Sequence, residues 1–463
     1  MKIVVLGAGR VGESVAEHLV AERNDITVVD TDPARLAALA DRFDLRTLAG
    51  NGIQPSVMRE AGCDDADMLI AVTARDETNL VACQIAARAF NVPTRIARVR
   101  STELLSAPDL TGPEGFCVDH LICPEQTVTD RIRKLIEFPE ALQVLEFAGG
   151  RVSLIAVRAY AGGPLVSRPI RELRQHIPSV DTRIVAVFRH EASMPVDGDT
   201  LIEPGDEVFF LAATGDIRTV MAELRRMDKP VRRVMIAGGG NIGLRLARAL
   251  GTAYQVRIVD AVRERCTYLS TQLPDATLVL QGDATDEQLL GDESVDQMDV
   301  FVAVTSDDED NIMSSLLAKR LGARRVIALI NRKAYADLME GSRIDVAIVP
   351  AQVTIGELLT HVRRGDVARL HSLRRGAAEA LEIVAHGDSH SCKAIGRRIE
   401  SIGLPAGATI GALVRGTPEG GSRVIIAHHD TVIESEDHVI VFVTNKALIP
   451  RVEKLFQVGV GFF

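Results

Sequence analysis

The stretch Gly7-Ala8-Gly9-Arg10-Val11-Gly12 decides the fold of this chain, and Gly238-Gly239-Gly240-Asn241-Ile242-Gly243 repeats it. Both clusters have the spacing G-x-G-x-x-G, close an apolar run and open a segment with helical periodicity. In that context the first glycine permits a tight turn, the second lets the backbone approach a phosphate, and the third lets the helix pack on the strand. One such cluster would be weak evidence, because glycine is common in turns. Two with the same surroundings predict two nucleotide sites, with phosphate at the N-terminus of each helix.

An acidic residue ends the next strand after each glycine cluster. The runs Ile26-Thr27-Val28-Val29-Asp30 and Val256-Arg257-Ile258-Val259-Asp260 have this form. A carboxylate at that strand tip can accept both ribose hydroxyls and repels a 2′-phosphate. The sequence therefore favours NAD(H) or an adenine nucleotide over NADP, and the alternative is a solvated aspartate at a strand end.

Short β-branched runs alternate with helical periodicity from Lys2 to Val99, which predicts a parallel sheet covered by helices. The expected strands are Lys2–Leu6, Ile26–Asp30, Arg46–Ala49, Met68–Val72 and Arg95–Val99. The expected helices are Val11–Glu22, Pro33–Arg42, Ile53–Ala61 and Glu77–Phe90.

The series restarts near residue 232, so the chain is read as a duplicated pair of domains. Ala71-Val72-Thr73 matches Ala303-Val304-Thr305, and Asp76-Glu77-Thr78-Asn79 matches Asp308-Glu309-Asp310-Asn311. The fold class is α/β, with two Rossmann-like parallel-sheet domains, each followed by a small α+β domain. The expected boundaries are 1–123 and 232–349 for the Rossmann domains, 124–140 and 350–366 for linker helices, 141–227 and 367–457 for the small domains, and 458–463 for an apolar tail.

Composition narrows the possible partners. The 53 Lys and Arg residues against 63 Asp and Glu residues give a net charge of −10 with no long basic run, which argues against nucleic acid as the main partner. Met1 leads directly into a strand, and the longest uncharged apolar stretch, Ile402–Val414, is too short to span a bilayer. The six cysteines contain no C-x-x-C motif, so reduced and buried thiols in a cytosolic chain are expected.

Catalytic and metal motifs are missing from the small domains. A dehydrogenase needs a proton donor or base near the nicotinamide, and the histidines here are scattered without matching positions in the two halves. The segment His386-Gly387-Asp388-Ser389-His390-Ser391-Cys392 could supply metal ligands, but a polar turn before a helix at Cys392–Ile399 explains it more simply. Cys117 and Cys123 lack a histidine partner and are read as buried thiols.

The two nucleotide sites differ in charge. Arg10 lies within the first glycine loop, where it can grip terminal phosphates or reach a neighbouring subunit, although a solvent-exposed cation is the alternative. Arg98 and Arg100 close the fifth strand, and the second half has Asn241, Leu329 and Asn331 at these three positions. Asp76-Glu77 and Asp308-Glu309 start helices, where the carboxylates either contact the ligand or a bridging cation, or are simply favourable for the helix dipole.

In this order the motifs resemble the RCK (regulator of potassium conductance) family. The tandem arrangement closely resembles the TrkA family of peripheral nucleotide-binding subunits in bacterial Trk potassium uptake systems, over residues 1–456. The resemblance implies a regulatory subunit that is not an enzyme and that binds NAD(H) and ATP or ADP. It further implies a homo-oligomeric, tetrameric ring that gates a membrane-embedded potassium-translocating subunit of the Trk type from the cytoplasmic face.

Site residues follow from the resemblance. In the first unit Gly7, Gly9, Arg10, Val11 and Gly12 would surround phosphates, Asp30 would bind the ribose, and Asn51, Thr73 and Glu77 would complete the pocket. Arg98 and Arg100 would reach phosphates, either in their own subunit or across a subunit boundary. In the second unit the matching set is Gly238, Gly240, Asn241, Ile242, Gly243, Asp260, Asp283 and Thr305. Because Asn241 lacks the charge of Arg10, the resemblance does not imply that the two sites use the same ligand.

Two other classes of protein remain as alternatives. An NAD-dependent oxidoreductase would use the small domains as substrate sites. An NAD-responsive transcriptional regulator would need a basic recognition helix, which the chain lacks. The ending Val458–Phe463 is an apolar tail that could dock on the ring or on a membrane partner, or fray.

Overall fold

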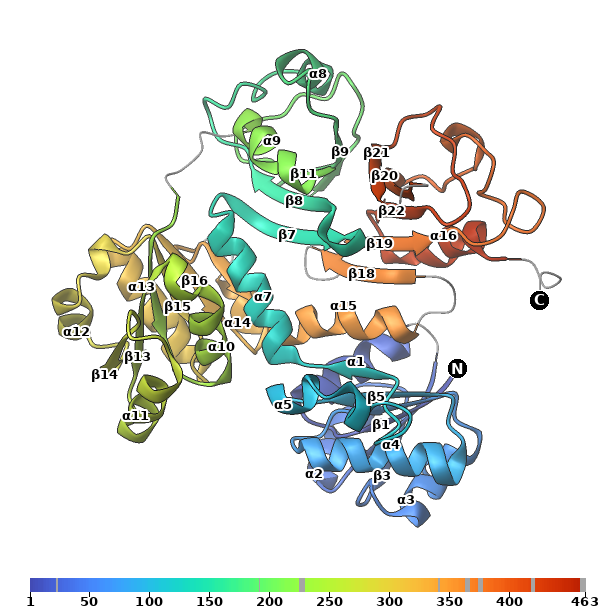
Figure 1. Cartoon of the computed structure of the whole chain (residues 1–463), viewed down its shortest axis with the longest axis vertical. Coiled ribbons are helices and arrows are strands. Elements are labelled where there is room, and N and C mark those ends of the chain that lie inside the picture. Colours follow the sequence, from blue (N-terminus) through green and yellow to red (C-terminus); the bar gives the residue numbers. More distant parts are fainter. Residues whose placement is uncertain are drawn as a thin grey trace. The chain divides into compact units, whose positions relative to one another are not determined.

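The chain forms two compact units in a computed structural model. The first unit comprises Met1–Val128 and Val349–His361, and the second comprises Thr129–Ile348 and Val362–Phe463. Figure 1 shows the ribbon of the whole chain. The structure describes residues 1–21, 24–190, 192–224, 230–339, 342–362, 367–373, 378–417 and 421–458.

The first unit contains a parallel sheet with the strand order β3-β2-β1-β4-β5-β6. Its strands are β1 (Lys2–Leu6), β2 (Asp25–Asp30), β3 (Arg46–Ala49), β4 (Met68–Ala71), β5 (Thr94–Arg98) and β6 (His120–Ile122). Its helices are α1 (Arg10–Ala21), α2 (Pro33–Ala40), α3 (Pro55–Glu60), α4 (Asp76–Phe90), α5 (Thr102–Leu105) and α6 (Pro108–Thr111). This is the doubly wound order, in which ligands bind at the carboxyl ends of the strands where the order reverses, here between β1 and β4.

The central strand β1 is apolar because both of its faces are covered. Ile3 lies opposite Ile26 of β2 and Met68 of β4, and Ile3 to Leu6 are almost fully buried. Strands buried on both faces form continuous apolar runs in parallel sheets. Helix α1 buries the stripe Gly12, Val15, Ala16 and Leu19, so the glycine loop between β1 and α1 is fixed at both ends.

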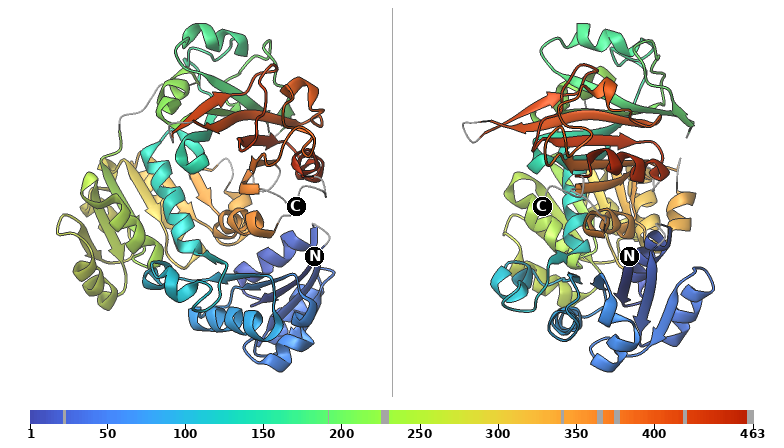
Figure 2. Two further views of the ribbon diagram at one scale, coloured as in Figure 1. Left: turned by 45° about the vertical axis from the view of Figure 1, so that its right-hand side comes forward. Right: turned by 90° about the vertical axis from the view of Figure 1, so that its right-hand side faces the viewer.

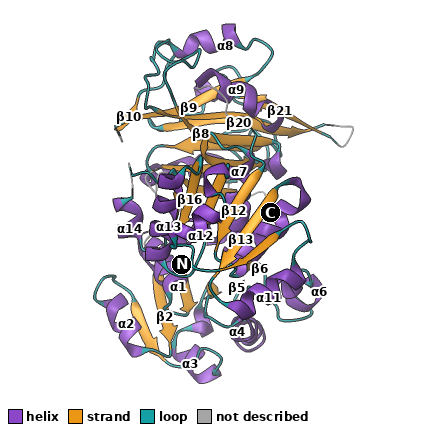
Figure 3. Cartoon of the chain, turned by 90° about the vertical axis from the view of Figure 1, so that its left-hand side faces the viewer, coloured by secondary structure: helices purple, strands orange, loops and turns teal. Residues whose placement is uncertain are grey.

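The second unit contains a parallel sheet with the same topology, β14-β13-β12-β15-β16-β17. Its strands are β12 (Arg233–Ala237), β13 (Gln255–Asp260), β14 (Leu278–Gln281), β15 (Val300–Ala303), β16 (Arg325–Leu329) and β17 (Val346–Ile348). Its helices are α10 (Asn241–Leu250), α11 (Arg263–Gln272), α12 (Glu287–Asp292), α13 (Asp308–Leu321) and α14 (Lys333–Leu338). Figure 3 shows this sheet with helices on its faces.

Two antiparallel sheets complete the second unit. One has the order β10-β9-β11-β8-β7, and the other has the order β18-β19-β22-β20-β21. The first consists of β7 (Ala141–Phe147), β8 (Val152–Arg158), β9 (Thr182–Arg189), β10 (Ala192–Met194) and β11 (Glu207–Ala213), with α8 (Leu173–His176) and α9 (Ile217–Leu224). The second consists of β18 (Val367–Leu373), β19 (Ala378–Val384), β20 (Ala408–Gly416), β21 (Ser422–Ile426) and β22 (His438–Val443), with α16 (Ile449–Phe456).

The two antiparallel sheets share one hydrophobic core. Phe209 of β11 lies 5.5 Å from Phe188 and 5.9 Å from Phe442 of β22, measured between ring centroids. A Cβ added at Gly411 would lie 2.1 Å from the side chain of Leu211, so glycine permits this close approach. Figure 2 shows the two sheets stacked face to face. The duplicated small domains therefore pack on each other within one chain.

Helices α7 (Pro124–Glu137) and α15 (Pro350–Val362) follow the two parallel sheets. The residues of α15 up to His361 belong to the first unit. There the imidazole of His361 stacks on that of His120 in β6, with 3.7 Å between ring centroids and 15° between ring planes.

The predicted α/β fold class is confirmed. Every strand and helix expected between Lys2 and Val99 is present, with ends shifted by at most two residues among those that the structure describes. The sequence did not predict the edge strands β6 and β17 or the antiparallel strands β7, β10, β18 and β19, which are short or interrupted by polar residues.

The predicted helix at Cys392–Ile399 is wrong. Gly396 has φ of +75° and donates its N–H to the carbonyl of Ile433 at 2.8 Å. The N–H of Ile399 likewise donates to Thr431 at 3.0 Å. Because these amides pair with a distant segment, the segment forms turns rather than a helix. Of the predicted apolar tail, Val458 pairs with Cys392 and residues 459–463 lie outside the described part.

Candidate functional site

The three glycines of the first loop have three different steric roles. Gly7 has φ of +107°, and a Cβ there would lie 3.1 Å from the backbone of Thr73. A Cβ at Gly12 would lie 1.8 Å from the carbonyl oxygen of Gly7. Around Gly9, in contrast, a Cβ would meet nothing within 4 Å. The loop is therefore closed toward the sheet and open above Gly9, where a phosphate could approach the backbone.

The second loop repeats this geometry. Gly238 has φ of +103°, and a Cβ there would lie 2.8 Å from the backbone nitrogen of Thr305. A Cβ at Gly243 would lie 1.9 Å from the carbonyl oxygen of Gly238, whereas one at Gly240 would meet open space. Both loops thus have the shape expected of a dinucleotide fingerprint.

The strand-end aspartates hold the glycine loops in place. Asp30 accepts a hydrogen bond from the N–H of Ala8 at 2.6 Å and from that of Asp32 at 2.8 Å. Asp260 accepts from Gly239 at 2.7 Å and from Val262 at 2.9 Å. These two hydrogen bonds orient each carboxylate at the carboxyl end of its strand, the position at which a dinucleotide fingerprint has its ribose-binding acid.

Two buried asparagines fasten the loops after β4 and β15. Asn79 accepts from the N–H of Thr73 at 2.9 Å and from its hydroxyl at 2.7 Å, and donates to the carbonyl of Arg98 at 2.9 Å. Asn311 makes the corresponding bonds to Thr305, at 2.8 Å for both, and to Leu329 at 2.9 Å. These asparagines were matched in the repeat but were given no role. The predicted site residues Thr73 and Thr305 depend on them for position.

The aspartates that open α4 and α13 bind backbone. Asp76 accepts from the N–H groups of Arg100 and Ser101, both at 2.9 Å. Asp308 accepts from those of Asn331 and Arg332, both at 2.8 Å. These carboxylates therefore close the loop after the next strand. Glu77 is exposed and remains a predicted ligand contact, with Arg75 3.7 Å away.

The three predicted phosphate-binding arginines lie in different environments. Arg10 is exposed on the first turn of α1, and its side chain has no hydrogen-bond or ion-pair partner within the described part of the chain. Arg98 pairs with Glu125 at 2.9 Å, and Nε of Arg100 lies 3.5 Å from the same carboxylate. Val11 is half-buried beside Arg10. Arg10 is therefore positioned to meet an added anion, whereas Arg98 and Arg100 already share one carboxylate.

The second loop carries more negative charge around it. Asn241 is exposed at the start of α10, and Ile242 is half-buried. Asp283, at the position of Asn51, accepts from the N–H and hydroxyl of Thr285 at 2.8 and 2.7 Å, which lowers its pKa. The side-chain oxygen of Asn51 accepts a longer hydrogen bond, 3.2 Å, from the N–H of Ile53.

A raised pKa at Asp310 marks the same difference between the sites. Burial raises the pKa of Asp310, and the neighbouring carboxylates Asp307, Asp283 and Glu309 raise it further. At the corresponding position of the first site stands Thr78, and Arg75 takes the place of Asp307. Among the described residues, the surroundings of Asp310 therefore hold more carboxylates than the matching positions of the first site.

Arg265 is a residue near the second loop that the sequence reading missed. Its Nε donates to the carbonyl of Gly239 at 2.5 Å, and its guanidinium lies over the ring of Tyr268 at 4.9 Å. The feature of the sequence that could have indicated Arg265 is its position five residues after the strand-end aspartate Asp260. The first half has Arg35 in this position, and there it pairs with Asp32 at 3.2 Å.

The proposed metal ligands do not assemble. Nδ1 of His386 lies 2.7 Å from Glu436, and Asp388 binds the N–H groups of His390 and Ser391 in a turn. Among the described residues, the structure contains no group of three or more potential metal-ligating side chains. All six cysteines are buried and unpaired by disulfides, as expected. Burial raises the pKa of Cys63 and Cys83 to about 12, which leaves these thiols protonated and unreactive.

This arrangement defines a class of protein: a tandem of two dinucleotide-type Rossmann domains, each with its own small antiparallel domain. A solved structure of the GsuK RCK domain shares this fold, with a TM-score of 0.61 at 16% identity, covering 98% of this chain and 94% of that one. The GsuK channel bound to NAD also has a TM-score of 0.61 at 16% identity, covering 98% of this chain and 78% of that one. At this identity the likeness concerns the fold alone.

Sequence comparison identifies the family. The TrkA-N domain model matches residues 3–122 and 234–350, and the TrkA-C domain model matches residues 154–225 and 389–457. The Trk system potassium uptake protein TrkA of Halomonas elongata is 58% identical over 100% of both chains, and that of Vibrio alginolyticus is 53% identical over 99% of both. The chain belongs to the TrkA family, which confirms the resemblance inferred from the motifs. Among the described residues no helix is both long and apolar enough to cross a membrane.

Proposed function

We propose that this chain is a nucleotide-sensing regulatory subunit of a potassium uptake system. It binds NAD(H) and ATP or ADP at the two glycine loops and gates a membrane potassium transporter of the Trk type. The observation that carries the proposal is the pair of loops that are closed toward the sheet but open above Gly9 and Gly240. Family membership supports the potassium-uptake role.

The two sites contribute differently in this proposal. The first loop offers Arg10, an exposed cation without a described partner, to a terminal phosphate. The second offers Asn241 and lies near Asp283, Asp307 and Asp310. ATP and ADP, which carry more phosphate charge per adenosine than NAD, are therefore assigned preferentially to the first site. The second site is assigned to a ligand with less phosphate charge, such as NAD(H).

Gating requires that a ligand bind two conformations unequally. Equal affinity for both shifts nothing, and coupling of ~1–3 kcal/mol per site is typical. Inverting a 1:99 equilibrium takes ~5.5 kcal/mol, so several sites acting together suffice. A homo-oligomeric ring, tetrameric for a chain with two Rossmann domains, would sum these contributions. The ring would sit peripherally on the cytoplasmic face of the membrane subunit.

The competing function is an NAD-dependent oxidoreductase. It would require an acid or base near the nicotinamide. At the described loops the polar side chains Asn79, Asp76, Asn311 and Asp308 bind backbone instead. In the regulatory function NADH absorbance stays flat when the protein is offered a panel of carbonyl compounds, whereas turnover would favour the oxidoreductase.

Glutamate substitutions at the open glycines test the nucleotide sites. Gly9→Glu and Gly240→Glu each place a carboxylate above one loop without backbone strain, because neither position has positive φ or a neighbour within 4 Å of a Cβ. Gly416→Glu is the matched control, at a third open glycine far along the chain. Calorimetric titration with NADH, ATP and ADP should lose one site in each loop variant and none in the control.

Partner binding is tested with the full chain. Co-purification with a candidate membrane potassium-translocating subunit should change in extent or stoichiometry when NADH, ATP or ADP is added. The double variant Gly9→Glu/Gly240→Glu should abolish that dependence while leaving the control variant responsive. Nucleotide binding without any association with such a subunit would contradict the gating role.

A further inference from the structure

Arg265, in the first turn of α11, has a different environment from its counterpart in the first half of the chain. Counted from the strand-end aspartates, it corresponds to Arg35 of α2. Asp32 caps the N-terminus of α2 and pairs with Arg35 at 3.2 Å, and both side chains are exposed. Val262 stands at the cap position of α11 and offers no carboxylate. Because Arg265 has no acidic cap to pair with, its guanidinium reaches the glycine loop instead.

The residue Gly239 joins Arg265 to the strand-end aspartate Asp260. Its N–H donates to Asp260 at 2.7 Å, and its carbonyl accepts from Nε of Arg265 at 2.5 Å. A Cβ at Gly239 would lie 2.4 Å from the side chain of Leu269, so glycine, in place of Ala8 of the first loop, leaves room for this packing. The cation and the acid that would bind a ribose therefore lie on either side of one loop residue.

The guanidinium of Arg265 has binding capacity that its described contacts do not use. One face lies over the ring of Tyr268, 4.9 Å from the ring centroid, and the counterpart of Tyr268 in the first half is Ala38. Nη2 is buried, and none of the residues that the structure describes accepts a hydrogen bond from it. A buried donor without an acceptor has lost its water and gained nothing in return, so an added acceptor stabilises it. The second face of the guanidinium and Nη2 are the groups that remain for a ligand.

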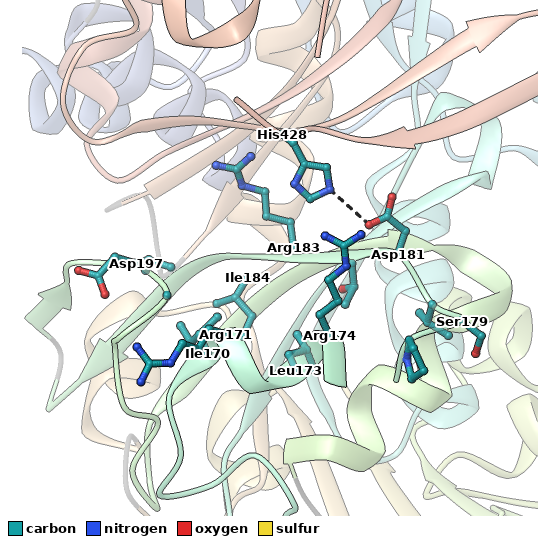
Figure 4. A pocket seen from close by; sticks show the side chains of 15 residues that line it. Ile170, Arg171, Leu173, Arg174, Ser179, Asp181, Arg183, Ile184, Asp197 and His428 are labelled. Carbon is teal, nitrogen blue, oxygen red and sulfur yellow. Dashed lines mark ion pairs between the residues drawn. The ribbon is translucent and has the colours of Figure 1, made fainter. Parts of the chain in front are cut away.

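The arginine-lined pocket of about 630 Å³ in the same unit contains its own carboxylates, in contrast to Arg265. There His428 lies 3.5 Å from Asp181, as Figure 4 shows, and Arg171 pairs with Asp199. Arg265 makes no ion pair within the described ranges of the chain. A cation that is held by a carbonyl and an aromatic ring, and is not neutralised by a carboxylate, keeps its charge for a ligand.

The two glycine loops have their cations at different parts of the expected ligand. Arg10 lies at the start of α1, where phosphates meet a helix N-terminus, and Asn241 takes its place in the second loop. Arg265 lies beside the loop residue that Asp260 binds, at the strand end where a dinucleotide has its ribose. Because the adenine is attached to that ribose, the base lies on the same side as the guanidinium.

We propose that Arg265 determines the specificity of the second site by binding the adenosine end of the ligand, with its guanidinium stacked between Tyr268 and the adenine. Guanidinium planes stack favourably on aromatic rings and on nucleobases, and Nη2 then donates to an oxygen of the ribose. The inference rests on the proposed function, since it requires that the second loop bind a nucleotide. It adds that this site recognises adenosine and tolerates different phosphate groups, whereas the first site recognises phosphate through Arg10.

The test measures binding at the second site in the full chain carrying Gly9→Glu, which removes the first site. Fluorescence titration with NADH gives the affinity, and AMP and ribose 5-phosphate are added as competitors. AMP should displace NADH much better than ribose 5-phosphate does, because only AMP carries the base. Arg265→Ala should weaken the binding of NADH and AMP by about ten-fold, the effect of one lost stacking contact, and should leave ribose 5-phosphate unchanged.

Further variants separate stacking from charge. Arg265→Lys keeps the charge but lacks the guanidinium plane, so it should recover only a small part of the affinity for NADH. Tyr268→Phe keeps the ring and should bind NADH as the parent chain does, whereas Tyr268→Ala should lose several-fold in affinity. Arg263→Ala removes an exposed arginine from the same turn of α11 and is the matched control, with no expected change.

The outcomes distinguish this inference from the proposed function. Unchanged NADH affinity in Arg265→Ala, or full affinity in Arg265→Lys, overturns the inference and leaves nucleotide binding at the second loop standing. Equal weakening of AMP and ribose 5-phosphate in Arg265→Ala also overturns it, because Arg265 would then only hold the loop in shape. If the Gly9→Glu chain binds no NADH at all, the proposed function fails at the second loop and the inference fails with it.

Discussion

The guanidinium of Arg325 on β16 donates to the carbonyl oxygen of Ala141 on β7 at 2.6 Å, although the two residues are 184 positions apart. The same guanidinium binds the carbonyl of Leu135 at 3.1 Å, near the C-terminal end of α7. Arg325 is 8% exposed. One cation of the second parallel sheet therefore satisfies helix-end carbonyls at the point where α7 leads into the first antiparallel sheet.

We expect Arg325→Ala to destabilise the second unit. The substitution leaves several buried carbonyls without a donor, which should lower the free energy of unfolding by about 2–4 kcal/mol. Thermal unfolding followed by circular dichroism measures the change. Arg324→Ala is the matched control, because its partner Asp299 is 3.5 Å away at the surface and such pairs contribute ~0–1 kcal/mol. Equal effects of the two substitutions would contradict the role given to Arg325.

Asn79→Ala should loosen the first nucleotide site and the fold around it. It removes the bonds to Thr73 and to the carbonyl of Arg98, all of them buried or partly buried, at a cost of about 2–4 kcal/mol. NADH and ATP affinity at the first site should fall with it, since Thr73 loses its position. Gln84→Ala on the same helix, whose bond to Gly115 is 3.4 Å long, serves as the control and should change little.

Arg10→Ala should reduce ATP affinity at the first site by roughly 10-fold or more, the effect of one lost charge-assisted hydrogen bond of about 1.5–3 kcal/mol. ADP should lose less, because the terminal phosphate is the group assigned to Arg10. The measurement is calorimetric titration with both nucleotides, with Arg35→Ala as a control outside the loop. Unchanged discrimination between ATP and ADP would falsify the assignment.

Removing negative charge at the second site should raise its affinity for ATP. Asp283→Asn and Asp310→Thr install the residues of the first site, Asn51 and Thr78. Removing each carboxylate should raise ATP affinity by several-fold, because it relieves ~0.3–1 kcal/mol of charge repulsion at a solvated site. Titrations in a Gly9→Glu background report on the second site alone. Asp292→Asn, an exposed position on α12, is the control; a gain of the same size there would show a general charge effect instead.

The stacked pair His120 and His361 should make the first unit sensitive to acid. Burial, and to a lesser extent the nearby His120, lower the pKa of His361 to about 4. The unfolded chain, with an ordinary histidine pKa near 6.5, binds more protons between these values, so stability falls as pH falls through that window. The loss from this residue should reach about 2 kcal/mol between pH 7.5 and pH 5.

His361→Phe keeps the stacked ring and removes the titration. Hydrogen exchange at the amides of β6 and α15 should then depend less on pH than in the wild type. His390→Ala, an exposed histidine of the second unit, should leave that dependence as it is. An unchanged pH profile in His361→Phe would exclude this pair as the cause.

The glycine spacing and the strand-end aspartates were sufficient to predict the architecture. The positive φ of Gly7 and the contact of Gly12 with the carbonyl oxygen of Gly7 are local to one turn, and their consequence is a helix packed on a strand. Because such constraints act over a few residues, they can be predicted from the sequence. The buried strands Lys2–Leu6 and Met68–Ala71 were equally legible, because a strand covered on both faces must be apolar throughout.

The roles of individual charged residues were harder to predict from the sequence than the architecture was. Asp76 and Asp308 could be ligand contacts or helix-start residues, and they bind backbone amides 24 residues or so away. Arg98 and Arg100 could reach phosphate, and they share Glu125. Cys392–Ile399 has helical composition, yet its amides pair with residues near Ile433. In each case the competing partner is distant in sequence and is brought close only by folding.

The sequence by itself determined that the chain is a duplicated pair of domains with two open glycine loops, because steric demands on glycine and the burial of strands are local. Tertiary structure alone decided which groups the arginines meet. It left Arg10 exposed, placed Arg325 on the carbonyls of Leu135 and Ala141, and brought Arg265 to the carbonyl of Gly239. A charge acts through space on whatever lies within a few ångströms, and sequence order does not determine those neighbours.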